Sequence, residues 1–536
     1  MKRSFDIAVV GSGFGGSLIA MIARRLGRTV VLLERGKHPR FAIGESSTPL
    51  ANLLLEELAR RYDLPQLLPL TKWGTWQVAH PELACGLKRG FTFYHHRWNE
   101  PFADTADHAR QLLVAASPHD RIADTHWYRP DFDHFFVRTA QSIGVEYLDE
   151  VKQTSAVCEP DGVTLSGTRD HSPVTFKARF VIDATGPRGF LHHALQLSEA
   201  SYEHYPATEA LFSHFTDVER FDEYLHRSAG FQTGHRVEVH GIGTPNRSSA
   251  LQPPYPPDDA ALHHVFPGGW IWVLRFNNGI TSAGVAASAA VAKELNFAAG
   301  ESAWHKLLEK LPSVAGQFAP AKACFPFIHQ PRLAFRSGQI VGPNWALLPS
   351  AAGFLDPLLS TGFPLTLLGV ERLGRALEND WGTARFAAVL ADYATQTKME
   401  LQVTAEMVGS LYANLADAEV FNALTQLYFA AASYAETARR LERPELADGF
   451  LLHRHPNFGP AMRECLARAR GPMSPVERKA LIADIARVIE PVNVAGLAQS
   501  RRRNWYPALA EDLFASAHKL GAGRREIEAL LERCGF

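Results

Sequence analysis

The chain has 536 residues, of which 46% are hydrophobic and 21% charged, and its 55 Lys and Arg nearly balance its 56 Asp and Glu. This balance argues against nucleic acid as a main partner, and the apolar content excludes a disordered chain. No apolar run is long enough to cross a membrane, and the run after Met1-Lys2-Arg3 is broken at Gly11, which argues against a signal peptide. The five scattered cysteines fit neither a disulfide framework nor a zinc site, which predicts a protein of the reducing cytoplasm.

A strand, a glycine-rich turn and a helix are predicted at the start of the chain, over residues 5–10, 11–16 and 17–23. A second strand over residues 29–33 ends at Glu34, about 20 positions after the first glycine. A Gly-x-Gly-x-x-Gly turn in this setting binds a dinucleotide, because its N–H groups approach the pyrophosphate while the acidic residue accepts hydrogen bonds from a ribose. The alternative is a glycine-rich turn of some other α/β domain. The expected contacts are Gly11, Ser12, Gly13, Phe14, Gly15, Gly16, Glu34 and Arg35.

Short strands with a hairpin turn at Asp161-Gly162 follow residues 145–147, and the last of them ends in Asp183-Ala184-Thr185-Gly186. This arrangement resembles the two-dinucleotide FAD oxidoreductases, in the branch of aromatic hydroxylases, geranylgeranyl reductases and flavin halogenases. The resemblance implies an α/β fold of the Rossmann type that holds one FAD, with Asp183 and Gly186 among its contacts. The segment Gly241-Ile242-Gly243 lacks a third glycine and is interpreted as a turn, so no nicotinamide domain is expected.

Two segments before residue 134 resemble flavin-contacting elements of the halogenases. Residues 44–49, Gly-Glu-Ser-Ser-Thr-Pro, resemble the Gly-Glu-Ser-x-x-Pro loop beside the flavin, which implies a contact from Ser47. Chemistry alone predicts that a Ser or Thr here caps a helix over residues 50–59. Residues 127–133 resemble the Arg-x-x-Phe-Asp element, which implies that Arg129 lies near the flavin. The alternative is that Asp131 or Asp133 only caps the following helix.

A strand is predicted over residues 268–276, with Trp270 and Trp272 on one face, and Asn278-Gly279 predicts a tight turn into a returning strand. The two tryptophans resemble the Trp-x-Trp-x-Ile-Pro signature of flavin halogenases. Leu274-Arg275 stands where Ile-Pro is expected. Because an aromatic stripe on a strand is ordinarily core, this segment supports the family only in part.

The loop over residues 353–362 gives the most specific match. It resembles the Asp/Glu-Pro-x-x-Ser-Thr-Gly loop that lies against the flavin ring in halogenases, and residues 348–352 replace the Gly-Asp-Ala-Ala of the hydroxylases. The turn into a helix over residues 363–368 presents free N–H groups, which suit an anion. The alternative is an ordinary capped helix. The resemblance implies flavin contacts from Asp356 and Phe363, a catalytic Ser360, and chloride or bromide at Thr361 and Gly362.

Halogenases also need a lysine that directs hypohalous acid to the substrate. This lysine acts as a hydrogen-bond donor or as a haloamine. Most lysines are solvated surface groups, but a buried ammonium can lose its proton. Lys88, between Gly86 and Gly90, resembles the Lys-x-Gly-x-x-Phe context of halogenases acting on phenolic or carrier-bound rings, so we expect it to be catalytic. Lys72 is the second choice. Leu359 replaces a glutamate of the tryptophan halogenases, which favours a phenol, resorcinol or pyrrole.

Residues 1–375 are expected to form the FAD-binding fold, with an inserted substrate-binding β-sheet region at about 190–320. Residues 376–536 are expected to be mainly helical and to cover the active site, with a capping box at Ser474-Pro475-Val476-Glu477. The adjacent histidine pairs lack ligand spacing, so no metal site is expected. Aromatic residues available to line a substrate pocket are Trp73, Trp76, Phe91, Phe93, Tyr94, Phe212 and Phe215.

The leading hypothesis is a cytoplasmic, FADH2- and O2-dependent halogenase of an electron-rich aromatic ring, free or carrier-bound. A separate flavin reductase is the expected partner. The alternatives are an FAD monooxygenase or oxidoreductase on the same fold without halogenation, and a flavin-binding protein without catalysis.

Overall fold

A parallel sheet built from distant parts of the chain carries the glycine turn in the computed structural model, which describes residues 3–228 and 252–536. The turn expected at residues 241–243 lies outside this description. Strand β1 (Arg3–Val10) pairs in parallel with β2 (Val30–Leu33) on one side and with β10 (Ser172–Asp183) on the other. The sheet extends in parallel to β7 (Glu146–Leu148) and β20 (Trp345–Leu347), with β19 (Val341–Gly342) antiparallel at one edge. The predicted α/β fold of the Rossmann type is confirmed.

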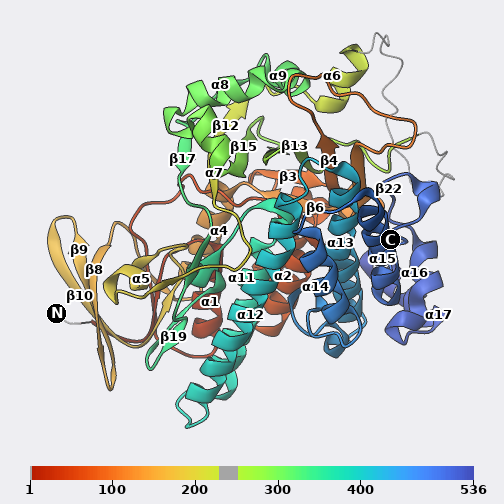
Figure 1. Cartoon of the computed structure of the whole chain (residues 1–536). Helices are drawn as coiled ribbons and strands as arrows, with labels where there is room; N and C mark the ends of the chain where they lie inside the picture. The colour runs from red at the N-terminus through yellow and green to blue at the C-terminus, as the bar shows by residue number, and fades with distance from the viewer. Residues whose placement is uncertain (1–2, 229–251) are drawn as a thin grey trace.

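A three-stranded meander extends one side of this sheet. Strands β8 (Lys152–Glu159), β9 (Gly162–Arg169) and β10 pair in antiparallel fashion, and Glu159 lies opposite Gly162 across the predicted hairpin turn. The meander projects from the body of the molecule on the side of the N-terminus (Figure 1).

Helices from three parts of the sequence pack beside the glycine turn. They are α1 (Phe14–Arg25), α4 (Arg129–Ser142) and α11 (Gly362–Asn379), and α1 contacts both of the others. Helix α2 (Pro49–Arg61) packs on α11 and begins where the sequence predicted, with Thr48 accepting a hydrogen bond from the N–H of Ala51. Four segments far apart in the chain therefore meet at the end of the sheet where the dinucleotide was expected.

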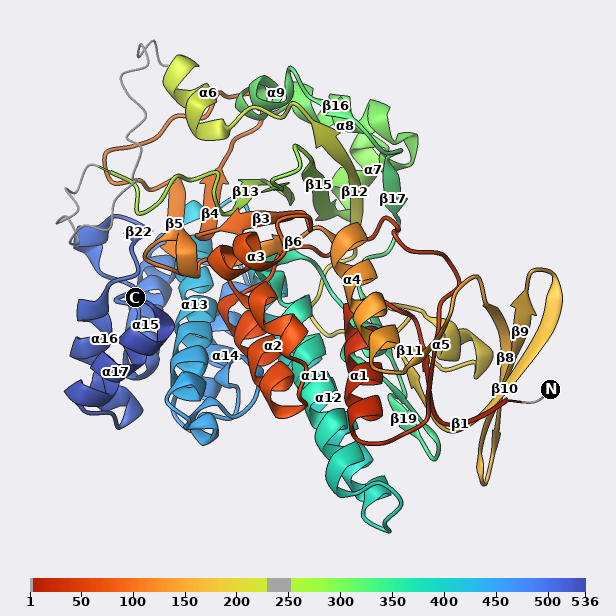
Figure 2. The same ribbon diagram turned by 180° about the vertical axis from the view of Figure 1, so that it is seen from behind.

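A second sheet lies above these helices in Figures 1 and 2. Its strands follow the order β16-β12-β15-β14-β13-β4-β5-β22, and β17 also pairs with β12. The strands are β4 (Gly90–His95), β5 (Gln111–Ala115), β12 (Thr208–Thr216), β13 (Ala261–Phe266), β14 (Gly269–Arg275), β15 (Thr281–Ser288), β16 (Lys322–Ala323), β17 (Ile328–Gln330) and β22 (Trp505–Tyr506). The region expected at 190–320 thus supplies only part of the sheet, because β4 and β5 precede it and β22 comes from the last third of the chain.

Short helices and strands complete the two sheets. The helices α6, α7, α8 and α9 lie in the region of the second sheet and frame a separate apolar cluster. A two-stranded pair, β3 with β6, lies next to that sheet. The bounds are α3 (Trp73–Ala79), α5 (Phe190–Ala194), α6 (Phe221–Ser228), α7 (Ala289–Leu295), α8 (Glu301–Glu309), α9 (Pro312–Phe318), α10 (Pro349–Ala352), β3 (Cys85–Lys88), β6 (Asp124–Trp127), β11 (Glu199–Ala200), β18 (Phe335–Ser337) and β21 (Gly353–Phe354).

The last third of the chain is helical, as its pattern predicted, apart from β22. The helices are α12 (Phe386–Tyr412), α13 (Ala418–Arg440), α14 (Phe458–Ala469), α15 (Pro475–Ile489), α16 (Ala510–Ser516) and α17 (Arg524–Cys534). The predicted capping box begins α15, since Ser474 and Glu477 exchange hydrogen bonds. The division expected between residues 375 and 376 falls inside α11.

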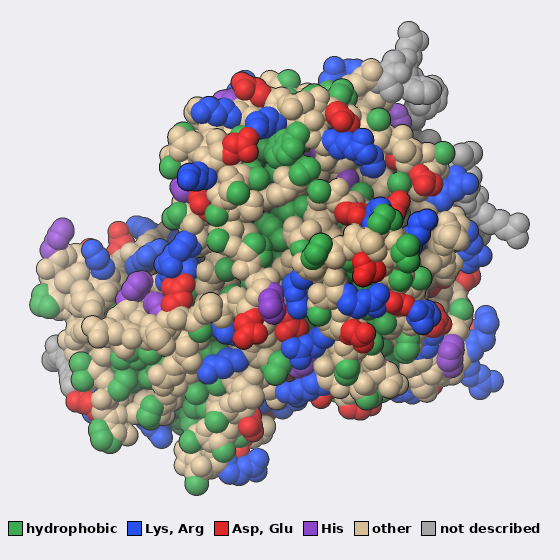
Figure 3. Space-filling view, in the orientation of Figure 1, with side chains coloured by type: hydrophobic (Ala, Val, Ile, Leu, Met, Phe, Trp, Pro, Cys, Tyr) green, Lys and Arg blue, Asp and Glu red, His purple; other side chains and the backbone are tan. Residues whose placement is uncertain are grey.

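Charged side chains of both signs are interspersed on the face shown in Figure 3, in keeping with the balanced composition. Within residues 3–228 and 252–536, no helix combines the length and the apolar character needed to cross a membrane. The same residues contain no cluster of His, Cys, Asp or Glu side chains suited to a metal ion.

Candidate active site

A cavity of about 860 Å³ opens at the carboxyl ends of β1, β2 and β10, beside the glycine turn. Gly11 has a φ of 97°, a conformation that favours glycine. A Cβ atom at Gly16 would lie 1.9 Å from the carbonyl oxygen of Gly11, so only glycine lets α1 begin this close to β1. The size and the exposed turn fit a dinucleotide such as FAD.

Most of the expected cofactor contacts line this cavity. They are Gly11, Gly13, Phe14, Gly15, Gly16, Glu34, Arg35, Arg129, Gly186, Asp356, Thr361, Gly362 and Phe363. Ser12, Ser47, Asp183 and Ser360 are not part of its lining. The hydroxyl of Ser12 donates to Glu34, and Asp183 accepts hydrogen bonds from Thr185 and from the N–H of Leu191. These two residues support the wall of the cavity from behind rather than forming it.

Glu34 lies at the end of β2 with its carboxylate buried. Burial opposes ionisation, but Arg40 and the N–H groups of Gly36 and Ser12 together hold the pKa of Glu34 below its usual value. The group therefore stays a carboxylate, which is the form that accepts hydrogen bonds from ribose hydroxyls.

Arg129 connects the two loops that border the cavity. Its guanidinium makes a bidentate pair with Asp133 and donates to the carbonyl oxygens of Ile43 and Gly44, at 3.2 and 2.9 Å. Asp133 also accepts a hydrogen bond from the N–H of Phe14 in the glycine turn. Neither acidic residue of the segment caps α4, since Asp131 instead accepts from the N–H of Ala84.

The loop before α11 has the shape expected of an anion site. Leu359 and Ser360 have φ values of 65° and 54°, which turn the chain sharply before Thr361 and Gly362. The first N–H groups of a helix have no partner inside it, and they suit a negative charge. A Cβ atom at Gly362 would meet nothing within 4 Å, so this position is open toward the cavity.

Asp356 holds this loop to the second sheet and to α12. Its carboxyl group accepts hydrogen bonds from the indole of Trp270 at 3.2 Å, the phenol of Tyr412 at 2.6 Å and the N–H of Leu358. Burial raises its pKa to about 6, although the three hydrogen bonds lower it. Trp272, the other signature residue, donates to Ser282 within the second sheet. Neither tryptophan is in the lining of this cavity or of the smaller one described below, and we interpret both as structural supports.

Lys88 is completely buried at the end of β3. Its amine donates to the hydroxyl of Ser46 at 2.8 Å and to the carbonyl oxygen of Ser47, and lies 3.9 Å from the centre of the Phe91 ring. Burial lowers the pKa of Lys88, and nearby Asp124 offsets part of this effect. Lys72, by contrast, is partly exposed and donates to the backbone of Cys534.

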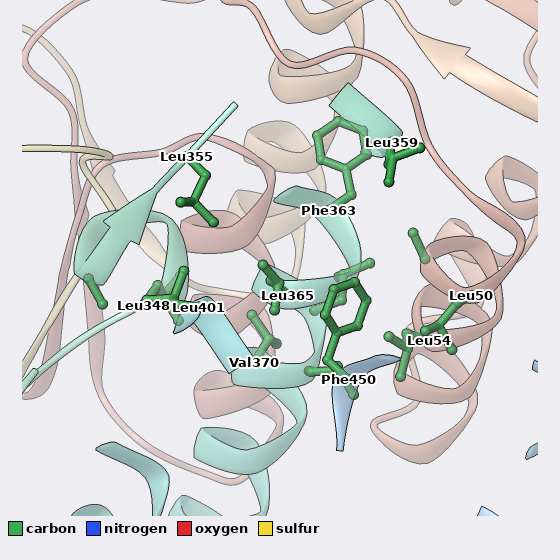
Figure 4. Close-up of a cluster of buried hydrophobic side chains, with 14 of the residues drawn as sticks. Leu50, Leu54, Leu348, Leu355, Leu359, Phe363, Leu365, Val370, Leu401 and Phe450 are labelled. Atoms are coloured by element: carbon green, nitrogen blue, oxygen red, sulfur yellow. The ribbon is translucent and has the colours of Figure 1, made fainter. Parts of the chain in front are cut away.

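A second cavity, of about 190 Å³, lies close to Lys88, since its neighbours Phe91 and Asp124 line that cavity. Two segments border both cavities, because Gly44 and Phe363 line the first while Thr48 and Pro364 line the second. Lys88 itself lines neither cavity, but its amine binds Ser46 and Ser47 in the segment that runs from Gly44 to Thr48. Figure 4 shows the apolar side chains around the start of α11 and α2, among them Phe363, Leu359, Leu50 and Phe450.

The walls of the second cavity come mostly from residues that the sequence did not indicate. Of the expected aromatic residues only Phe91 lines it, while Trp76 stacks on Phe132 in the core and Phe215 packs under α8 and α9. Helix α13 supplies the principal aromatic walls, Tyr428 and Phe429. No motif marks these positions, which look like ordinary core residues of an apolar helix.

Two buried acidic residues near Lys88 were also missed. Asp124 lies opposite Lys88 in the β3–β6 pair and lines the second cavity. Glu45 pairs with the ring of His214 at 2.9 Å, and both side chains are buried. Glu45 belongs to the halogenase-like loop, which was a usable signal, but nothing in the sequence connects Asp124 or His214 to it.

No family model matches the chain. The tetracycline 7-halogenase of Kitasatospora aureofaciens is 27% identical over 399 residues, which cover 72% of this chain and 66% of that protein. The monodechloroaminopyrrolnitrin halogenase PrnC of Pseudomonas fluorescens is 26% identical over 80% of this chain and 71% of its own length. The chain is thus similar to flavin-dependent halogenases over most of its length, and the predicted resemblance is confirmed.

Solved structures agree with the fold. Halogenase PltM matches with a TM-score of 0.77 at 23% identity, over 94% of this chain and 99% of that one. A PltM complex with phloroglucinol and FAD matches with a TM-score of 0.70 over 98% of this chain. This chain therefore shares the fold of these proteins, in which a Rossmann-type sheet is combined with a second sheet and C-terminal helices.

Proposed function

We propose that this protein is an FADH2- and O2-dependent halogenase that chlorinates or brominates an electron-rich aromatic ring. The observation that carries the proposal is the position of Lys88. Its buried amine binds the segment between Gly44, in the wall of a cavity that fits FAD, and Thr48, in the wall of a smaller cavity lined by aromatic side chains. A surface lysine could not keep a reactive halogen species away from water.

Each part of the site has a defined role in this proposal. Reduced flavin, when bound, supplies with O2 the oxidising power that converts halide to hypohalous acid. Residues 11–16 and Glu34 would hold its nucleotide part, and Thr361 with Gly362 would hold the halide. Lys88 would then orient hypohalous acid through a hydrogen bond toward the second cavity. Ser360 would position the halide loop, since its side chain does not line the flavin cavity.

The substrate class follows from the walls of the second cavity and from the relatives. Leu359 offers no carboxylate to assist at an indole carbon, which favours a ring that its own substituent activates. One relative is a chlorinase of 1H-pyrrole-2-carbonyl peptidyl-carrier protein, and one solved neighbour holds phloroglucinol. A phenol, resorcinol or pyrrole, free or carrier-bound, fits both observations.

A separate flavin reductase and a cytoplasmic location complete the proposal. The sequence contains one complete glycine fingerprint, at residues 11–16, so reducing equivalents would arrive as FADH2 made elsewhere. All five cysteines are free, as expected in a reducing compartment.

The direct test supplies the protein with FADH2, O2 and bromide, with monochlorodimedone or a resorcinol panel as acceptor. We expect brominated product from the native chain and almost none from Lys88→Ala. Lys398→Ala, at an exposed lysine of α12 that lines neither cavity, is the matched control and should keep most of the activity. Lys72→Ala tests the second-choice lysine, which lines the second cavity. Product that is hydroxylated but never halogenated would favour the monooxygenase alternative, as would NADPH oxidation without an added reductase.

A further inference from the structure

Asp124 is a buried carboxyl group in the wall of the second cavity that the proposed mechanism leaves unused. It begins β6, is 7% exposed and accepts one hydrogen bond, from the amide of Asn52 at 2.8 Å. Its other oxygen, Oδ2, has no hydrogen-bond partner among residues 3–228 and 252–536. A carboxylate can accept about four hydrogen bonds, and a buried acceptor left unsatisfied destabilises the protein. A ligand that donates a hydrogen bond would correct this.

The charged groups around Asp124 also favour its carboxyl group as a proton acceptor. Lys88 faces it from the neighbouring strand β3, but the amine of Lys88 donates to Ser46 and Ser47 instead. Helix α13 adds Glu436 and Arg440, which pair with each other at 2.7 Å. Burial raises the pKa of Asp124, and Glu436 raises it further, while Lys88 and Arg440 lower it. The carboxyl group is therefore more basic than an exposed aspartate, which suits it to exchange a proton with a weak acid such as a phenol.

We propose that Asp124 binds a hydroxyl group of the aromatic substrate and accepts its proton during halogenation, so that the second cavity selects a phenol over a ring without a free hydroxyl. This inference rests on the proposed function and adds a catalytic residue to it. The aromatic side chains of Phe91, Tyr428 and Phe429 would hold the ring, while Asp124 would set which edge of the ring faces Lys88.

In the proposed reaction, every proton that is released is taken up by Lys88, by Asp124 or by the departing hydroxide. As the ring carbon forms a bond to halogen, the halogen–oxygen bond of hypohalous acid breaks, and the released hydroxide takes a proton from the Lys88 ammonium to give water. The phenolic O–H bond breaks and its proton goes to Asp124, which leaves a dienone. The ring carbon then loses its hydrogen as a proton to the neutral Lys88 amine, and Asp124 returns its proton to the oxygen. The ring has exchanged hydrogen for halogen, and both side chains are restored.

The test measures binding without turnover, in holoenzyme loaded with oxidised FAD and without halide or reductant. Calorimetric titration compares resorcinol with 1,3-dimethoxybenzene, which accepts hydrogen bonds but cannot donate them. We expect the native protein to bind resorcinol on the order of 10- to 100-fold more tightly, the range of one charge-assisted hydrogen bond. In Asp124→Asn the amide N–H can donate to either ring, so the preference should fall to within about threefold.

Controls separate a lost contact from a damaged fold. Asp120→Asn removes an exposed carboxyl group four residues away and should keep the preference. Asp124→Ser offers a smaller second variant that also removes the carboxylate. A merely structural defect would weaken the binding of both rings in proportion and leave their ratio unchanged.

Each outcome has one meaning. Equal binding of the two rings by the native protein, or an undiminished preference in folded Asp124→Asn or Asp124→Ser, would overturn the role of Asp124. If the native protein binds neither ring and halogenates nothing with FADH2, O2 and bromide, the proposed function itself fails. Bromination by the native protein together with an unchanged binding ratio would reject Asp124 alone.

Discussion

Gly16 has no side chain, and this allows α1 to begin in close contact with the glycine turn. The sequence motif predicted this close approach. In the structure, a Cβ atom at Gly16 would lie only 1.9 Å from the carbonyl oxygen of Gly11. Neither the helix nor the buried strand β1 can shift easily, because both belong to the main apolar core.

Gly16→Ala should therefore impair cofactor binding. Forcing an atom into a packed region costs about 1–3 kcal/mol, and if this strain falls on the turn the affinity for FAD should drop roughly 10- to 100-fold. Titration of the apoprotein with FAD, followed by flavin fluorescence, measures the effect. Gly471→Ala, at an exposed position with room for a methyl group, is the control. Unchanged FAD affinity in Gly16→Ala would contradict the assignment of the turn.

Asp356 makes the stability of the protein depend on pH in a defined direction. Burial raises the pKa of this carboxyl group from 3.8 to about 6 in the folded protein. Because the folded value lies above the unfolded one, the stabilisation associated with the protonated carboxyl is complete below pH about 4 and is lost as the pH rises through about 6.

Asp356→Asn should remove this part of the pH dependence. Denaturant unfolding of the holoenzyme between pH 4 and 7 should show the native protein losing stability relative to the variant as the pH rises. The asparagine keeps hydrogen-bonding capacity toward Trp270 and Tyr412, so the loop before α11 should stay in place. A native protein that instead gained stability over this range, relative to the variant, would show that Asp356 is not held in a raised-pKa environment.

Helix α15 contributes to the stability of the protein without lining either cavity. It packs against α13, which carries Tyr428 and Phe429 in the wall of the second cavity. Its capping box, formed by Ser474 and Glu477, satisfies N–H groups that the first turn leaves without partners.

Ser474→Ala should lower the free energy of unfolding by about 1 kcal/mol. The denaturant midpoint of the purified holoenzyme reports this change. Halogenating activity at 25 °C should stay close to that of the native protein, because neither Ser474 nor Glu477 lines either cavity. A large loss of activity with unchanged stability would mean that α15 takes part in the site directly.

The glycine turn and the elements beside it in the chain were predictable from sequence because their geometry is local. The strand, turn and helix over residues 3–25 are contiguous, and Glu34 follows within one more strand. The short strand that ends at Lys88 was also predicted, from the glycines that flank it. In each case the signal and the structure it predicts lie within a few tens of residues.

The substrate half was not predictable in the same way. Asp124 reaches Lys88 only through the pairing of β3 with β6, and Phe429 meets Phe91 across more than 300 positions of sequence. Apolar residues on a helix pack against a core in almost any fold, so their pattern cannot say which of them face a cavity. The same limit explains why the second sheet recruits β4, β5 and β22 from outside the expected insertion.

Phe429→Ala should change the substrate range of the whole site. Its ring packs edge-on against Phe91 at 5.1 Å, and truncation would enlarge the second cavity while lowering stability by about 3 kcal/mol. We expect a higher KM for resorcinol and improved turnover of bulkier phenols, measured by product analysis across a size series. A uniform loss for all sizes would place Phe429 in the supporting core rather than in the wall.

The pairing of β22 with β5 places Trp505 and Tyr506 beside a strand formed from residues 111–115. The second cavity is also lined by Tyr506, Leu531 and Phe536, more than 400 positions after Phe91 in the same lining. A chain shortened before residue 505 would therefore keep the glycine turn and its flanking strand and helix, but would leave the aromatic chamber without part of its wall.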